Sequence, residues 1–418
     1  MNVTVREAFH RVKKESTRAR QFMLIAGEPS GDLLAADLVR ALQSAIEDPF
    51  PPRFFGAGGS GMADAGVELV EDMTSHSTIG LWEAIEHLGH FYRIFRHLVR
   101  TAVQRQPDYI VCVDYAGFNR RFARAIRGRC RSQDGPFQNW NPKIIQFVSP
   151  QVWASRPGRA WKMARDFDLL LSIFPFEKEW YTRRVPGFPV EFVGHPLMDR
   201  YPRLDHWEQP GSAEQQPPLV LLLPGSRAGE LARHIPVIVT AARRIKTQVD
   251  ARFQLIVPST ALAAMANSLC QESKRRDLAA SSFDLQSHPH IEIQAGGLQE
   301  GLRSATIAIA SSGTVTMECA RFGVPTVVLY RTSWLTYVVA RQIATVRFLA
   351  MPNLLADREL FPEFIQNDAT ADNLSRAALG FLNNPERMRY VKTDLAGVIQ
   401  ALGKPGASER AASAILGL

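Results

Sequence analysis

Short apolar runs alternate with longer amphipathic stretches along most of the chain. The runs are rich in Val, Ile and Leu, which is typical of buried parallel strands. A first series lies at 22–26, 53–56, 67–70, 109–113, 144–148, 169–173 and 190–193, and a second at 219–223, 253–257, 291–293, 306–310 and 326–330. The stretches between them, such as 33–45 and 118–127, have helical spacing. The pattern predicts an α/β protein with two Rossmann-like doubly wound parallel sheets.

A polar segment rich in Pro and Gln separates the two series. It covers residues 201–218 and is the best candidate for a linker. We therefore predict a basic N-terminal extension at 1–20, an N-terminal domain at 21–200, a C-terminal domain at 219–370 and C-terminal helices at 371–418. Open α/β sheets bind ligands at the carboxyl ends of their strands, so two such domains are expected to hold two substrates across a cleft.

Composition narrows the class of partner. The 418 residues are 46% hydrophobic and 22% charged, which indicates a globular protein, and the net charge of +8 favours anionic partners. No nucleic-acid-binding module is visible, so a phosphorylated substrate or an anionic lipid is favoured over nucleic acid. The four cysteines form no CxxC pair, so neither a zinc site nor a disulfide framework is expected. No run approaches the about 18 apolar residues of a membrane-spanning helix, and residues 1–20 lack the apolar core of a signal peptide.

Two strand–turn–helix junctions in the second half suit a nucleoside diphosphate. In one, Ser312, Gly313 and Thr314 form a small polar turn after a strand, and Glu318 follows one turn into the helix. Backbone N–H groups at such a turn bind phosphate, and the carboxylate suits ribose hydroxyls. In the other, a strand runs into Gly225, Ser226 and Arg227, where a guanidinium can grip a diphosphate. The plain alternatives are a capped helix and a surface arginine.

The first half offers a carboxylate at a strand end. Asp114 follows the strand at 109–113 and is a candidate general base, although a helix-capping role is the alternative. The loop after the first strand brings backbone and polar groups to the same edge of the sheet, either for sugar hydroxyls or as a helix cap: Gly27, Glu28, Ser30, Gly31 and Asp32.

Two segments resemble known binding motifs but are not predicted to bind a cofactor or a metal. The segment 56–61 fits GxGxxG but follows the second strand and precedes a short helix, so no dinucleotide cofactor is predicted. Asp166 and Asp168 resemble a metal-binding DxD, but no other ligand lies nearby, so no metal is predicted.

The stretch 79–100 is amphipathic and basic. Core packing and contact with a membrane surface both remain open for it. The apolar residues assigned to membrane contact are Ile79, Leu81, Trp82, Ile85 and Leu88.

Eight segments, in order, resemble the lipid-A-disaccharide synthase family. They are AGEPSGD at 26–32, VDYAGFN at 113–119, VSPQVWASR at 148–156, FPFEK at 174–178, FVGHP at 192–196, LLPGSR at 222–227, SGTVTMEC at 312–319 and MPNLLADREL at 351–360. The resemblance implies a GT-B glycosyltransferase that joins UDP-2,3-diacylglucosamine to 2,3-diacylglucosamine 1-phosphate (lipid X), giving a β-1,6 disaccharide 1-phosphate and UDP. It also implies a cytoplasmic enzyme held peripherally at the inner membrane, and a homodimer with swapped C-terminal parts; in a monomer, the helices at 371–418 would instead cross back to the N-terminal domain.

The resemblance also assigns roles. It makes Asp114 the general base, places Arg227 at the UDP diphosphate, and gives Glu318 the ribose. Asn353 matches an essential asparagine near the nucleotide, and 79–95 matches the segment held responsible for membrane contact. The chain departs from the usual residues of the family at Ala116, Gly117 and Ser155. These departures concern the acyl-chain preference and the details of the acceptor loop. The alternatives are another GT-B enzyme, either a GlcNAc transferase acting on a lipid-linked muramyl acceptor or a UDP-GlcNAc 2-epimerase, and a non-catalytic UDP-sugar-binding scaffold.

Overall fold

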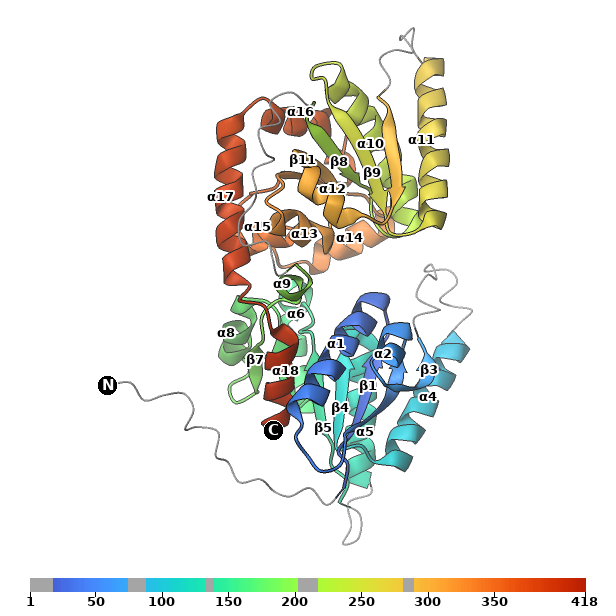
Figure 1. Ribbon diagram of the computed structural model, residues 1–418, viewed down its shortest axis with the longest axis vertical. Coiled ribbons are helices and arrows are strands. Elements are labelled where there is room, and N and C mark those ends of the chain that lie inside the picture. The colour runs from blue at the N-terminus through green and yellow to red at the C-terminus, as the bar shows by residue number, and fades with distance from the viewer. Residues whose placement is uncertain (1–17, 74–87, 133–138, 202–216, 281–288) are drawn as a thin grey trace, which may run out of the picture. The chain divides into compact units, whose positions relative to one another are not determined.

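The computed structural model describes residues 18–73, 88–132, 139–201, 217–280 and 289–418. The chain divides into two compact units (Figure 1). The first combines Met1–Val152, Gly158–Pro196 and Gly406–Leu418, and the second combines Trp153–Pro157 with Leu197–Pro405. Each unit is an α/β structure built on its own parallel sheet.

The sheet of the first unit has seven parallel strands in the order β3-β2-β1-β4-β5-β6-β7. Apolar side chains on both faces of its central strands are buried, as expected when helices cover both faces. The strands are β1 (Gln21–Ala26), β2 (Arg53–Gly58), β3 (Glu68–Asp72), β4 (Tyr109–Val113), β5 (Lys143–Phe147), β6 (Leu169–Ser172) and β7 (Val190–Phe192).

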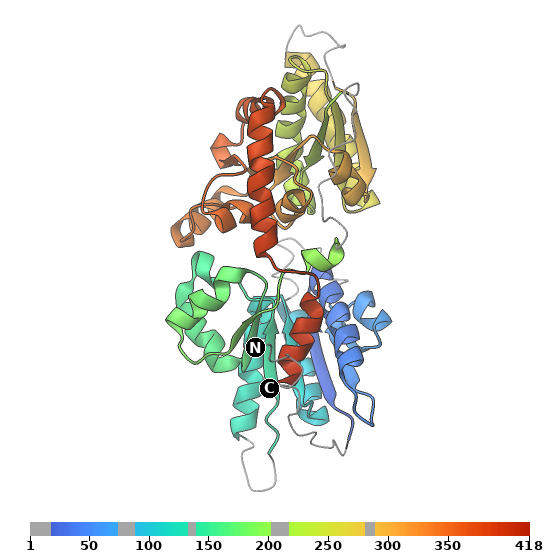
Figure 2. The same ribbon diagram turned by 60° about the vertical axis from the view of Figure 1, so that its left-hand side comes forward.

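Helices cover this sheet, and α18 at the end of the chain is one of them (Figure 2). α18 packs against α1, and the guanidinium Nε of Arg410 donates to the carbonyl of Val193 at 2.7 Å. The helices are α1 (Pro29–Ala45), α2 (Ser60–Asp64), α4 (Leu88–Arg105), α5 (Ala116–Ser132), α7 (Ala160–Asp166), α8 (Pro175–Arg184) and α18 (Ala407–Leu416). Two short helices, α6 (Val152–Ser155) and a 3₁₀ helix (Pro157–Arg159), span the division between the units.

The sheet of the second unit has six parallel strands in the order β10-β9-β8-β11-β12-β13. They are β8 (Leu219–Leu223), β9 (Arg252–Val257), β10 (Ile291–Ala295), β11 (Ile307–Ser311), β12 (Thr326–Tyr330) and β13 (Glu363–Ile365). The helices are α9 (Leu197–Arg200), α10 (Ala228–Lys246), α11 (Thr260–Ala280), α12 (Leu298–Ser304), α13 (Val315–Arg321), α14 (Trp334–Ile343), α15 (Met351–Ala356), a 3₁₀ helix (Gln366–Asp368), α16 (Ala371–Leu382) and α17 (Pro385–Ala401).

Both sheets reverse their strand order at one point. In the first unit this point lies between β1 and β4, and in the second between β8 and β11. Ligands of open α/β sheets bind outside the carboxyl ends of the strands at such a reversal. The segments that follow these four strands are the ones that the sequence selects: 27–32, 114–119, 224–227 and 312–314.

The elements agree with the predicted pattern, with shifts at their ends. The first helix begins at Pro29 rather than 33, because proline is favourable at the first helical position. Strand β13 was not predicted; it has three residues and none is fully buried, so no apolar run marks it. Most of the predicted linker (202–216) and of the basic extension (1–17) lies outside the described residues.

Candidate active site

Asp114 is held in an unusual backbone conformation at the end of β4. Its φ is +49°, in the left-handed region that few side chains other than Asn and Asp adopt readily. Its N–H donates to the Phe147 carbonyl at 2.6 Å. Its carbonyl accepts from the side-chain amides of Asn119 at 2.9 Å and Gln146 at 3.0 Å, both fully buried. These three hydrogen bonds fix the direction in which the carboxyl leaves the chain.

The loop after β1 packs directly against Asp114. A side chain at Gly27 would overlap the ring of Tyr115, since its Cβ would lie 2.4 Å from a ring carbon. At Gly31 a Cβ would lie 3.6 Å from the Cβ of Asp114. Burial raises the pKa of the Asp114 carboxyl, and the negative charge of Glu28 raises it further. A carboxyl with an elevated pKa is better matched to proton abstraction near neutral pH.

Two further residues of this loop have different surroundings: Asp32 is buried and Ser30 is exposed. The Asp32 carboxylate is buried and accepts backbone N–H groups of Gly59, Gly61 and Met62 at 2.7–3.2 Å. It thus occupies the helix N-terminus within the GxGxxG segment, where a dinucleotide phosphate would bind. We therefore expect Asp32 to position the loop rather than to contact substrate. Ser30 is exposed in the first turn of α1.

In the second unit, the turn after β8 is shaped by Glu230. Gly225 has a φ of +125°, and a Cβ there would lie 2.3 Å from Oε2 of Glu230. The same oxygen accepts the N–H of Ser226 at 3.0 Å. Arg227 is 73% exposed and its guanidinium lies 3.8 Å from Glu230, so this pairing is weak. The arginine is free to turn toward an anion at this turn.

No pattern in the sequence indicates that His234 supports this turn. His234 lies on α10 and is fully buried. Its Nδ1–H donates to the Pro224 carbonyl at 2.6 Å, and its Nε2 accepts the N–H of Arg331 at 3.0 Å. A carbonyl only accepts and an N–H only donates, so the ring is neutral with its proton on Nδ1. His234 therefore ties the turn after β8 to the end of β12.

The turn after β11 is open to solvent. Gly313 and Thr314 are exposed, and a Cβ at Gly313 would meet nothing within 4 Å. The N–H of Ser312 donates to the Leu329 carbonyl at 3.1 Å, which joins the turn to β12. The side chain of Thr316 closes the turn by donating to the Gly313 carbonyl at 2.7 Å. Hydrogen bonds therefore hold this turn in place, while Gly313 and Thr314 stay accessible to solvent.

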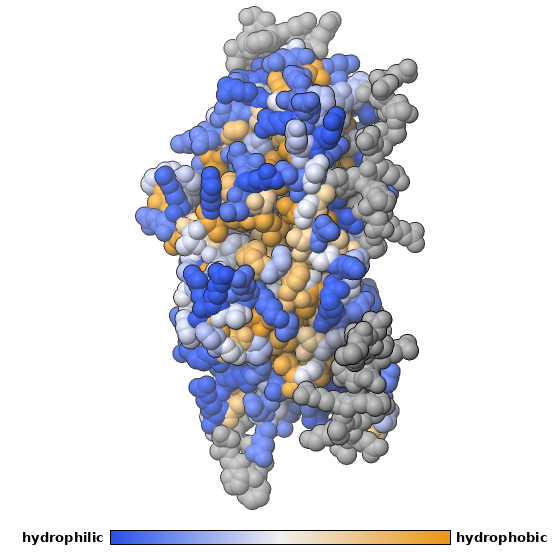
Figure 3. All heavy atoms as spheres, turned by 90° about the vertical axis from the view of Figure 1, so that its left-hand side faces the viewer, coloured by the Kyte–Doolittle hydropathy of each residue, from blue (hydrophilic) through white to orange (hydrophobic). Residues whose placement is uncertain are grey.

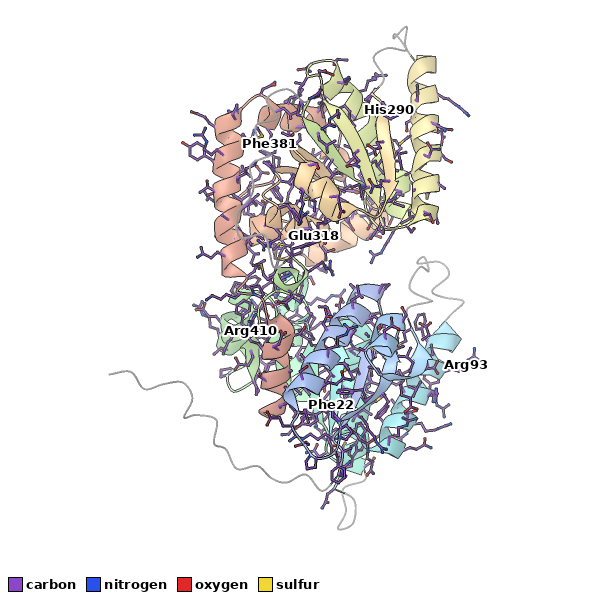
Figure 4. The ribbon with its side chains drawn as sticks, in the orientation of Figure 1. Phe22, Arg93, His290, Glu318, Phe381 and Arg410 are labelled. Atoms are coloured by element: carbon purple, nitrogen blue, oxygen red, sulfur yellow. The ribbon has the colours of Figure 1, made fainter. Side chains whose placement is uncertain are left out.

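Glu318 lies one turn into α13 and is nearly buried (Figure 4). Its Oε1 accepts hydrogen bonds from the hydroxyl of Tyr201 and from Arg200, both at 3.1 Å. Neither partner was singled out in the sequence, because both come from a distant segment that is brought to α13 only by folding.

Asn353 is fully buried on α15. Its side-chain oxygen accepts the N–H groups of Leu360 and Phe361, both at 2.8 Å. Its amide nitrogen donates to the Phe361 carbonyl and to Glu363, both at 2.7 Å. All its hydrogen-bonding capacity supports the segment 360–363, so we expect any effect of Asn353 on the nucleotide to be indirect.

Four of the residues assigned to membrane contact, Ile79, Leu81, Trp82 and Ile85, lie outside the described residues. The fifth, Leu88, begins α4. Asp166 forms an ion pair with Arg165, and Asp168 forms one with Arg127. Within the part of the chain that the structure describes, no three His, Cys, Asp or Glu side chains gather where they would hold a metal ion.

Comparison with known proteins identifies the family. The family model described as "Lipid-A-disaccharide synthetase" matches residues 22–417. The chain belongs to the lipid-A-disaccharide synthase family. Two relatives that carry this name are the protein of Geobacter sulfurreducens, 35% identical over 95% of this chain and 97% of its own, and "Lipid-A-disaccharide synthase 1" of Legionella pneumophila strain Lens, 33% identical over 92% and 94%.

Solved structures support the fold of this lipid-A-disaccharide synthase family member. A putative UDP-N-acetylglucosamine 2-epimerase from Listeria monocytogenes has a TM-score of 0.58 at 16% identity, covering 95% of this chain and 96% of its own. MurG of Acinetobacter baumannii has a TM-score of 0.54 at 13% identity, covering 96% and 100%. The calicheamicin glycosyltransferase CalG4 has 0.56 at 14%, covering 96% and 98%. The predicted GT-B fold, with two Rossmann-like parallel-sheet units, is confirmed.

Proposed function

We propose that this protein transfers 2,3-diacylglucosamine from UDP-2,3-diacylglucosamine to the 6-hydroxyl of lipid X with inversion, releasing UDP. The observation that carries the proposal is the placement of two complementary sets of groups. A carboxyl of raised pKa lies at the strand-order reversal of the first sheet, and an arginine with two polar turns lies at that of the second. A family match over residues 22–417 supports the choice of sugar.

Asp114 is the general base of this reaction. Its carboxylate takes the proton from the acceptor hydroxyl as that oxygen attacks the anomeric carbon of the donor. The fixed backbone at Asp114 suits this role, because a base must stay within hydrogen-bond reach of the proton it removes. Glu28 helps to hold the Asp114 pKa above its ordinary range, and its own carboxylate is available for a sugar hydroxyl.

The leaving group is UDP. Negative charge grows on the diphosphate as the glycosidic bond breaks, and preorganised donors that meet this charge lower the barrier. Arg227 supplies such a donor, and the exposed turn at Gly313 and Thr314 supplies others. The N–H of Ser226 is already held by the Glu230 carboxylate, so Gly225 and Ser226 contribute by the shape of their turn.

The alternatives are less well supported. Likeness to the epimerase and to MurG is at 16% and 13% identity and concerns the fold. The relatives at 33–35% identity are named as lipid-A-disaccharide synthases and align over nearly the whole chain. A non-catalytic scaffold gives no reason for the left-handed, hydrogen-bonded placement of Asp114 at the end of β4.

UDP release with and without lipid X tests the proposal. We expect release from UDP-2,3-diacylglucosamine only when lipid X is present, with one disaccharide formed per UDP. An epimerase would convert UDP-GlcNAc without any acceptor. A GlcNAc transferase would need a muramyl lipid instead of lipid X. Absence of lipid X-dependent release would refute the assignment.

We also propose that the first unit docks on an anionic membrane surface. The described residues contain no helix long and apolar enough to cross a bilayer. Figure 3 shows the first unit from the side of α8, away from α4, and hydrophilic and hydrophobic residues are mixed there. On α4, Arg93 points away from the helix (Figure 4) and Tyr92 is 61% exposed. The neighbouring α5 has arginines but no acidic residue, and within the described residues Arg121 and Arg124 make no ion pair. Arginine beside aromatic groups suits lipid phosphates.

Vesicle flotation tests the docking. We expect binding to vesicles that contain anionic phospholipid and weaker binding to purely zwitterionic ones. Substitution of Trp82 and Leu88 by serine, and separately of Arg121 and Arg124 by glutamine, is expected to reduce flotation. The matched control is Arg376→Gln on α16 of the second unit. Unchanged flotation of both double variants would contradict the docking proposal.

The remaining assignments are a cytoplasmic location at the inner membrane and a homodimer. They follow from the family resemblance, and light scattering of the purified protein at several concentrations tests the second. A mass of twice 46.6 kDa is expected. A monomer at all concentrations would contradict it, and would leave α18 to complete the first unit of its own chain.

A further inference from the structure

The segment at the start of the second unit is clamped to α13. Tyr201 follows α9 directly and is only 8% exposed. Its carbonyl accepts from the guanidinium of Arg321 at 2.6 Å, and its ring lies edge-on to that of Phe322, with centroids 5.0 Å apart. Its hydroxyl donates to Glu318 at 3.1 Å. Three residues of one short stretch therefore hold the carbonyl, ring and hydroxyl of Tyr201.

The two donors to Glu318 differ in strength. Tyr201 is buried, and burial together with the Glu318 charge raises the pKa of its hydroxyl to about 12, so it stays a donor at any physiological pH. Arg200 is 51% exposed, and its attraction to Glu318 is weakened by solvent. The Tyr201 hydroxyl is therefore the main constraint on the carboxylate.

Both donors meet the same oxygen. Oε1 of Glu318 takes both hydrogen bonds, whereas Oε2 receives none from any described residue. A carboxylate with one oxygen held in place has its second oxygen directed, with its lone pairs available to an incoming hydroxyl. A free glutamate side chain would instead lose rotamer entropy when it bound a ligand.

We propose that Tyr201, aided weakly by Arg200, is a positioning residue that fixes Glu318 so that Oε2 accepts a ribose hydroxyl of the nucleotide. The inference rests on the proposed binding of UDP in the second unit. Tyr201 thereby sets how well the site distinguishes a ribonucleotide from a deoxyribonucleotide. A site built to bond a hydroxyl rejects the analogue that lacks it, because its buried polar group is left unpaired.

Calorimetric titration with UDP, 2′-deoxy-UDP and 3′-deoxy-UDP tests the proposal. The wild-type protein is expected to bind at least one deoxy analogue about tenfold more weakly than UDP, the range of a hydrogen bond to a charged group. In Tyr201→Phe, which keeps the ring against Phe322, the discrimination is expected to fall to about threefold or less, mainly through weaker UDP binding. Arg200→Met should have a smaller effect.

Two comparisons separate positioning from folding. Tyr390→Phe removes a hydroxyl from a side chain that is 72% exposed on α17, and should leave both UDP affinity and discrimination unchanged. Glu318→Gln should lose discrimination by itself, and adding Tyr201→Phe to it should change discrimination no further. A thermal unfolding curve for Tyr201→Phe shows whether the ring packing persists.

The outcomes distinguish the two levels of the proposal. If the wild-type protein does not discriminate, Glu318 does not hold the ribose, and both that assignment and the role of Tyr201 fall. If the wild-type protein discriminates and Glu318→Gln does not, but Tyr201→Phe keeps the wild-type ratio, then only the positioning role of Tyr201 is overturned. A failure to bind UDP at all would instead refute the proposed function.

Discussion

The imidazole Nε2 of His234 accepts the backbone N–H of Arg331 at 3.0 Å, although 97 residues separate them in the chain. Through its other nitrogen, His234 also holds the Pro224 carbonyl. The sheet order places β11 between the strands that carry these two partners. One buried side chain thus links the turns on either side of the 312–314 turn.

Replacing His234 by phenylalanine is expected to weaken both stability and UDP binding. The ring volume is kept, but a buried carbonyl and a buried N–H lose their partners, at about 1–3 kcal/mol each. Chemical denaturation and UDP titration of the same preparation measure the two effects. Equal UDP affinity in a destabilised variant would show that the link serves folding alone.

Stability should also depend on pH through His234. Burial lowers the pKa of its imidazole below the ordinary 6.5. Below pH 6.5 the unfolded chain takes up a proton that the folded protein does not, so folded stability is lost as the pH falls from 6.5 through the lowered value. The drop in unfolding free energy between pH 7.5 and 5 should be smaller in His234→Phe. An identical drop in both proteins would contradict the assignment.

Glu28→Gln is expected to move the acid limb of the rate profile to lower pH. Burial raises the pKa of Asp114 above 3.8, and the charge of Glu28 adds to the shift. Activity is lost as the pH falls through this raised pKa, because the base becomes protonated. Without the Glu28 charge the pKa drops. Glu47→Gln, an exposed residue beyond α1, is the matched control and should leave the limb in place. If the acid limb does not move in Glu28→Gln, the charge of Glu28 does not raise the pKa of Asp114.

Arg227→Ala should weaken UDP binding about tenfold or more with little change in stability. The side chain is 73% exposed and its nearest carboxylate is 3.8 Å away, so few contacts of the folded protein are lost, whereas a charge-assisted bond to the diphosphate disappears. Arg244 lies near the end of α10 and pairs with Asp372 on the surface, so Arg244→Ala serves as the control. UDP affinity unchanged by the Arg227 substitution would exclude it from the diphosphate site.

Asn353→Ala is expected to act mainly on stability. The substitution leaves the N–H groups of Leu360 and Phe361 without their acceptor inside the protein, which costs about 1–3 kcal/mol for each group. Unfolding by urea measures the loss. A large fall in UDP affinity with unchanged stability would instead indicate direct contact with the nucleotide.

Much of the fold is readable from the sequence because buried parallel strands leave apolar runs. The runs at 109–113, 219–223 and 326–330 are strands with the predicted bounds. The strand at 363–365 escaped prediction because its side chains are only partly buried and it includes Glu363. Local pattern reveals where the chain turns from strand to helix, and so it found the turns at 225–227 and 312–314.

The sequence does not reveal which distant residues support the candidate site. Asp32 reads as a loop residue open to substrate, but folding brings it to the N–H groups at 59–62. His234 reads as an ordinary helix residue, and Tyr201 as the start of a linker. Each of the three residues has a partner that lies 27, 97 or 117 residues away, and no periodicity marks such pairs.

The central claim is that Asp114 removes the acceptor proton in the transfer to lipid X. Single-turnover formation of the disaccharide by Asp114→Asn, measured beside UDP affinity, tests it most directly. Because the Asp114 pKa is raised by burial, the amide should be tolerated, with stability at neutral pH equal to or above that of the wild-type protein. We predict a rate about 10²–10⁴-fold lower with UDP affinity unchanged. A rate within about threefold of the wild-type value would contradict the mechanism.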